Sequence, residues 1–154
     1  MRRILYNMEF RGRGVADPAG DNISITKSFA PCVRFTTEIT ANGVDMRTEQ
    51  LVGPKAEFVS KVQNLDHSEF AAGKPFREWG TICFGNGNLL NFDTVGAGEF
   101  NPMGDDGQMQ GGIVWCVEGG TGLFDKATGI ITSNFGINAA GDVIDYHTGV
   151  IYVP

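Results

Sequence analysis

The chain has 154 residues, enough for one domain that buries a core without disulfide or metal staples. Its net charge of −6 at pH 7 argues against nucleic-acid binding, because phosphate contacts need a clustered basic surface. No stretch approaches the ~18 consecutive apolar residues of a membrane-spanning helix. We therefore predict a single domain over residues 1–154, with no nucleic-acid partner and no membrane span.

The three cysteines, Cys32, Cys83 and Cys116, are odd in number, lack CxxC spacing and each fall in a strand-like segment. Such cysteines are typical of reduced, buried small hydrophobes in a reducing compartment. We therefore predict a cytoplasmic protein.

Polar and apolar residues alternate over residues 4–12, which predicts a first strand. Asn7 and Glu9 lie two apart on the face that also carries Leu5 and Arg11. If this face points into an apolar cavity, desolvation prepares Glu9 for general acid–base work, while Asn7 binds a substrate oxygen and Arg11 adds a contact. The alternative is that this face is exposed and Glu9 pairs with a neighbouring arginine in water.

Further β patterns recur along the chain, separated by glycine, asparagine, aspartate and proline. An Asn42-Gly43 hairpin joins two of them, Pro54 interrupts another, and loops are expected over residues 65–78 and 101–108. We expect eight or nine strands in total. The β-patterned segments from which they form are residues 4–12, 23–26, 33–40, 44–52, 56–63, 79–84, 88–95, 113–117, 130–137 and 143–153. The even spacing predicts an all-β fold, a single antiparallel eight-stranded barrel of calycin-like type.

Five aromatic residues on these strands, Tyr6, Trp79, Phe92, Trp115 and Phe135, are candidates for the wall of a ligand pocket. Large aromatic side chains on barrel strands also serve as core filling, so this alternative stays open.

The last strand carries a second polar pair, Asp145 and His147. A histidine beside a carboxylate is a potential acid–base pair. The opposite face of this strand is the more apolar, so we expect that face to be buried and the pair to lie in solvent.

With two histidines and no ligand-spaced cluster, a metal site is not expected. The chain also lacks a phosphate loop and a nucleophile elbow. We therefore predict no metal and no organic cofactor.

Residues 117–124 (VEGGTGLF), with Ala127 and Gly129 after them, resemble the glycine-rich corner of the allene oxide cyclase barrel, a relaxed form of which occurs in dirigent proteins. Residues 5–9 and 79–84 are similar to two strands of that barrel. The resemblance implies an eight-stranded barrel without cofactor and a dimer or trimer. It also implies that the first strand points a Glu and an Asn into the cavity, at positions that match Asn7 and Glu9 with the residue types exchanged.

From these features we expect a cofactor-independent isomerase or cyclase, with a lyase as a variant, that acts on a hydrophobic, polyketide-like small molecule. The barrel would hold a flexible substrate in a reactive shape. The alternative is a binding protein without chemistry, either a carrier or a dirigent-like protein that controls stereochemistry. A third possibility is a structural barrel filled by Phe and Trp.

Overall fold

The computed structural model describes residues 1–16, 22–68, 71–104 and 106–154, except for the side chains of residues 15–16, 31–40 and 44–54. It contains nine strands and one short 3-10 helix. The elements are β1 (Arg2–Ala16), β2 (Ile23–Thr40), β3 (Gly43–Asn64), β4 (Phe76–Cys83), β5 (Leu89–Thr94), β6 (Glu99–Pro102), β7 (Met109–Thr121), η1 (Gly122–Phe124), β8 (Thr128–Ile137) and β9 (Asp142–Val153).

All nine strands form one antiparallel sheet in the order β5-β4-β3-β2-β1-β9-β8-β7-β6, and a pairing between β5 and β7 closes it. Eight strands thus make a closed barrel, and β6 pairs with the first part of β7 as an extra strand. The prediction of an all-β, eight-stranded antiparallel barrel is confirmed. Within the barrel, each of these eight strands has a paired neighbour on both sides.

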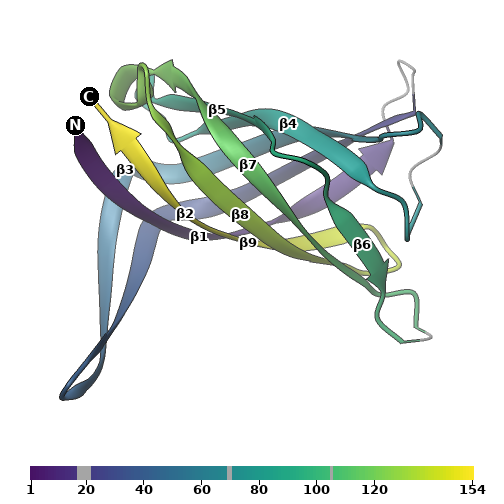
Figure 1. Cartoon of the computed structure of the whole chain (residues 1–154), viewed down its shortest axis with the longest axis horizontal. Coiled ribbons are helices and arrows are strands. Elements are labelled where there is room, and N and C mark those ends of the chain that lie inside the picture. Colours follow the sequence, from purple (N-terminus) through teal and green to yellow (C-terminus); the bar gives the residue numbers. More distant parts are fainter. Residues whose placement is uncertain (17–21, 69–70, 105) are drawn as a thin grey trace.

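The strands at the start of the chain are longer than expected. Residues 23–26 and 33–40 belong to the one strand β2, which carries a register shift between Pro31 and Val33. Likewise β3 continues through Pro54. The expected interruption at Pro54 is therefore not found. The hairpin of β2 and β3 extends away from the barrel body, as Figure 1 shows. Part of the loop expected at residues 101–108 is instead β6.

The glycine-rich corner closes one end of the barrel, near both termini (Figure 1). Gly119 has φ of 74°, a conformation that favours glycine. Gly120 passes so close to β5 that a Cβ there would lie 1.8 Å from the Leu89 carbonyl oxygen. Phe124 and Ala127 are both buried, and Phe124 packs on the Phe84 ring with centroids 4.9 Å apart. We call this the corner end.

The opposite end carries the turn between β8 and β9 and the segment between β3 and β4. We call it the open end, because a cavity lies there, lined by Gly14, Thr26, Val62 and Gly141 among others.

Candidate functional site

The inner face of β1 is apolar, with Ile4, Tyr6, Met8 and Phe10 all buried. Asn7 and Glu9 alternate with them and therefore lie on the outer face, each half-buried. The expectation that these two side chains point into the barrel is wrong.

Glu9 instead forms the exposed ion pair with a neighbouring arginine that was the alternative expectation. Its Oε1 accepts a hydrogen bond from Arg11 Nε at 2.6 Å, with the two side chains 37% and 64% exposed. Arg11, expected near substrate, thus lies on the outside with Glu9.

The expectation for the last strand is also wrong, in the opposite sense. Asp145 and His147 are buried, with 4% and 0% exposure, while Tyr146 between them is exposed. The pairing of β9 with β1 explains this, because it sets His147 opposite Met8 and Asp145 opposite Phe10 on the same inner face.

The buried pair belongs to a hydrogen-bonded chain across three strands. His147 Nε2 lies 2.9 Å from Asp145 Oδ2, and His147 Nδ1 lies 3.3 Å from the Tyr6 hydroxyl oxygen. Ser133 Oγ donates to Asp145 Oδ1 at 2.6 Å. With its proton on Nε2, the imidazole donates to Asp145 and accepts from Tyr6, so both Asp145 oxygens have a partner.

Aromatic rings fill the middle of the barrel around His147. Its ring centroid lies 4.6 Å from that of Phe10, 5.0 Å from Phe58 and 4.9 Å from Trp115. Phe92 packs on Trp115 with centroids 4.4 Å apart. Three of the predicted pocket aromatics therefore face inward, namely Tyr6, Phe92 and Trp115. They pack the core and do not line the cavity at the open end.

Of the other two predicted pocket aromatics, Phe135 lines the open-end cavity, whereas Trp79 lies elsewhere. It is half-buried, and the guanidinium carbon of Arg77 lies 5.0 Å from its ring centroid. Arg77 in turn pairs with Asp93, a short ion pair that holds the pKa of that carboxyl below its usual range. The Trp79 ring therefore belongs to a polar cluster away from the cavity.

A second buried carboxyl, that of Glu78 on β4, lies inside the barrel near Asp145 and its hydrogen-bonded chain. It is 5% exposed, and its Oε1 accepts a hydrogen bond from Ser60 Oγ at 2.5 Å. The Thr94 hydroxyl fixes its backbone, since it accepts from the Glu78 N–H at 2.7 Å and donates to the Glu78 carbonyl at 2.6 Å.

Burial raises the pKa of Glu78 to about 8, and the negative charge of Asp145 contributes in the same direction. The hydrogen bond from Ser60 and the nearby indole N–H of Trp115 act against this shift. The Trp115 Nε1 atom is itself buried without a hydrogen bond of good geometry, so it approaches the carboxyl without fully binding it. At neutral pH Glu78 is therefore mostly protonated.

Glu78 and Asp145 both line the cavity at the open end, which has a volume of about 300 Å3. Most of its wall is apolar, and hydroxyl groups lie on one side. The lining residues are Gly14, Ser24, Thr26, Val62, Phe76, Glu78, Gly107, Met109, Phe135, Ile137, Asn138, Ala139, Gly141, Val143 and Asp145. A mainly apolar pocket with a few convergent polar groups is typical of a small-molecule site.

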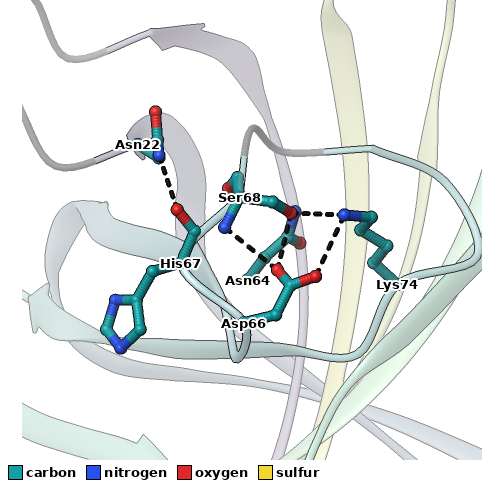
Figure 2. Close-up of polar contacts among 6 residues, drawn as sticks. All are labelled: Asn22, Asn64, Asp66, His67, Ser68 and Lys74. Atoms are coloured by element: carbon teal, nitrogen blue, oxygen red, sulfur yellow. Dashed lines mark hydrogen bonds and ion pairs between the residues drawn. The ribbon is translucent and has the colours of Figure 1, made fainter.

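The segment after β3 is held by a compact polar network (Figure 2). Asp66 accepts hydrogen bonds from the Ser68 backbone N–H at 3.0 Å and hydroxyl at 2.5 Å, and pairs with Lys74 Nζ at 3.0 Å. These bonds hold the pKa of Asp66 well below its usual range. Asn22 Nδ2 donates to the His67 carbonyl oxygen at 2.5 Å, which ties this segment to the start of β2.

In the part of the chain that the structure describes, no group of three or more His, Cys, Asp or Glu side chains is arranged to hold a metal ion. No helix within the same residues is long and apolar enough to span a bilayer. Cys83 and Cys116 are free thiols, half-buried where full burial was expected, and the Cys32 side chain lies outside the described residues.

Glu78 was missed because the sequence assigned it to the end of a loop. The signal lay in the alternation that begins two residues earlier, since Phe76, Glu78, Ile82 and Phe84 are in phase and all buried. Asp145 was recognised as part of a polar pair but was expected in solvent. The outer face of β9 is apolar too, so the alternation did not decide which face points inward.

Comparison with known proteins finds no matching family model, no matching curated protein and no matching solved structure.

Proposed function

We propose that this protein is a cofactor-independent isomerase or cyclase that binds a small, mainly apolar molecule in the open-end cavity. The single observation that carries the proposal is the buried carboxyl of Glu78 at the wall of a cavity of about 300 Å3, where burial raises its pKa. A carboxyl group whose pKa lies near the working pH is suited to transfer a proton to its guest.

In this proposal Glu78 protonates a carbonyl oxygen of the guest, which leaves positive charge on the guest and a carboxylate at Glu78. The carboxylate then removes a C–H proton from the guest, which becomes an enol, and Glu78 regains its acid form. That acid protonates the enol at the rearranged carbon, and the carboxylate takes back the proton on oxygen, so Glu78 ends as it began. Asp145, held by Ser133 and His147, is the fixed negative charge beside it. A charged group that is already oriented and buried stabilises such charge without reorganisation. The roles first assigned to Glu9 and Asn7 thus pass to Glu78 and Asp145.

A test reaction of suitable size is the isomerisation of 3-cyclohexen-1-one to the conjugated ketone, which loses one C–H proton and gains another. We expect the protein to accelerate it, the Glu78→Gln variant to lose that acceleration, and the Glu9→Gln variant to keep it. Ultraviolet absorbance of the conjugated product follows the rate. Equal rates in both variants would contradict the proposal.

A second candidate is a binding protein without chemistry, such as a carrier or a dirigent-like protein. It is favoured by the engagement of both Asp145 oxygens within the barrel, which is the arrangement of a structural network. It predicts that Glu78→Gln changes affinity for a guest while no reaction occurs in either protein.

The relation to allene oxide cyclase-like barrels is part of the proposal, as is a cytoplasmic location. The corner motif at residues 117–124 supports the relation. The outward direction of Asn7 and Glu9 departs from the pattern that the resemblance implied.

We also propose a homodimer or homotrimer. Leu5 and Ile130 are both exposed, at 37% and 49%, and both pair with Val150 in register, so an apolar row crosses β1, β9 and β8 on the outside. Sedimentation equilibrium of the wild type and of Ile130→Glu tests this, since the charge should dissociate an assembly that buries the row.

A further inference from the structure

The open-end cavity has an unbalanced charge. Two carboxyl side chains, Glu78 and Asp145, line it, and among the described lining residues there is no Lys, Arg or His. The groups that face Glu78 are Ser60 from β3, Trp115 from β7 and Asp145 from β9, with His147 behind Asp145.

Cations near the open end are already engaged. Arg13 Nε lies 3.4 Å from Asp142 Oδ1, and an Arg13 terminal nitrogen donates to the Ala140 carbonyl at 3.2 Å. Lys74 binds Asp66 and Ser68, as Figure 2 shows. Both therefore have acceptors of their own outside the cavity.

The surroundings of Glu78 favour its ionised form once a positive charge is present. Ser60 donates to its Oε1, and the buried Trp115 Nε1, which has no hydrogen-bond partner of its own, approaches the same carboxyl. Burial and the charge of Asp145 oppose ionisation in the empty barrel. A cation from outside would offset both the burial of Glu78 and its repulsion by Asp145, because it adds an opposite charge in a site of low dielectric.

We propose that the open-end cavity binds a protonated amine with a compact apolar body, its ammonium group between Glu78 and Asp145. The apolar part lies against the wall formed by Phe76, Met109 and Phe135. A cavity of about 150 Å3 can hold benzene, so about 300 Å3 is enough for a ring with a short amine chain. On binding, the Glu78 O–H bond breaks, its proton passes to solvent, and the carboxylate pairs with the ammonium.

This inference rests on the proposed function only for the site, because binding of an amine needs no turnover. It also deepens that function, since a stable ammonium resembles the positively charged state that proton transfer from Glu78 would create on a neutral guest.

Three probes of one shape and different charge provide the first test. Isothermal titration calorimetry compares 2-phenylethylamine, 2-phenylethanol and phenylacetate. We expect the amine to bind about tenfold more tightly than the alcohol, and phenylacetate not to bind. Equal or tighter binding of the alcohol or of phenylacetate, or no binding of any probe at millimolar concentration, would overturn the proposal.

The second test counts protons in the wild-type protein. Amine titrations in buffers of different ionisation enthalpy should show release of about one proton per molecule bound near pH 6.5 and close to none near pH 9. Amine binding without proton release near pH 6.5 would overturn the proposal, and this test requires no variant to fold.

Matched variants supply the third test. Glu78→Gln should lose the preference for the amine over the alcohol, while Glu9→Gln, which removes a carboxylate on the outside of the barrel, should keep it. Retention of the preference in Glu78→Gln would overturn the proposal. Amine selectivity without turnover of 3-cyclohexen-1-one would refute the proposed function alone, and turnover without amine selectivity would refute this inference alone.

Discussion

Two adjacent strands, β1 and β9, each carry a polar pair spaced two residues apart, yet the pair on β1 lies outside the barrel and the pair on β9 inside. Asn7 and Glu9 are half-buried on the outer face, and Glu9 pairs with Arg11. Asp145 and His147 are buried. The same local pattern thus gives a surface ion pair on one strand and an interior network on the next.

The difference comes from the other inward-facing residues of each strand. On β1 every inward residue from Ile4 to Phe10 is large and apolar, so no polar group competes for the interior. On β9 the inward phase also holds Val143, Ile151 and Val153, which are buried, and these decide the orientation of the polar pair between them. Because Asp145 and His147 are buried, they need hydrogen-bond partners inside the barrel. Ser133 bonds to Asp145, and Tyr6 bonds to His147.

The largest expected effect concerns Glu78, the second interior carboxyl. Its folded-state pKa is raised to about 8 from an ordinary 4.5, so the folded protein holds a proton that the unfolded chain releases. The contribution of Glu78 to stability should therefore be largest below about pH 4.5 and fall as pH rises toward 8, by up to about 1.4 kcal/mol per pH unit. Urea unfolding of the wild type and Glu78→Gln across this range measures it.

The Glu78→Gln variant should lose that slope, because it has no proton to release. Glu9→Gln should keep the wild-type slope and serves as its control. A wild-type slope that persists in Glu78→Gln would mean that another group causes the pH dependence.

Removal of the interior carboxylate on β9 has the next largest effect. Asp145→Ala leaves the Ser133 hydroxyl and the His147 Nε2 atom buried without their partner. We expect a loss of about 2–4 kcal/mol in the free energy of unfolding, measured by urea denaturation at neutral pH. A loss below about 0.5 kcal/mol, the range of a surface pair, would remove the distinction between the two strands.

A smaller effect is expected at the far end of the interior network. Tyr6→Phe keeps the ring packed against Phe84 and removes the hydroxyl that lies 3.3 Å from His147 Nδ1. The loss should be about 1 kcal/mol, measured in the same way. The chemical shifts of the His147 ring nitrogens should move as well, and unchanged shifts would argue against this contact.

The smallest effect belongs to the outer pair on β1. Glu9→Gln breaks an ion pair whose two side chains are 37% and 64% exposed, so the change in unfolding free energy should stay within about 0.5 kcal/mol. High salt should reduce even that difference. A loss as large as that of Asp145→Ala would show that the outer face carries a structural role that its exposure does not indicate.

The sequence predicted the architecture better than the site. Alternation, the hairpin signal at Asn42-Gly43 and the glycine corner were enough for an antiparallel barrel, because each depends on local chemistry. The two-residue turn itself lies one position earlier than predicted, at Ala41 and Asn42, because Gly43 already pairs with Thr40. Which face of a strand points into the barrel depends on the strands that pair with it, so the inner faces of β1 and β9 could not be assigned from either strand alone. Glu78 became visible only when its phase with Phe76 and Ile82 was combined with the pairing to β3.

The central claim is that Glu78 is a buried carboxylic acid at the cavity wall, and its own titration tests this most directly. Carboxyl carbon NMR of glutamate-labelled protein, with the signal assigned by its absence in Glu78→Gln, follows its protonation with pH. The account predicts a midpoint near 8, well above that of Glu residues in water. A midpoint near 4.5 would contradict it, and with it the roles proposed for this carboxyl in proton transfer and in amine binding.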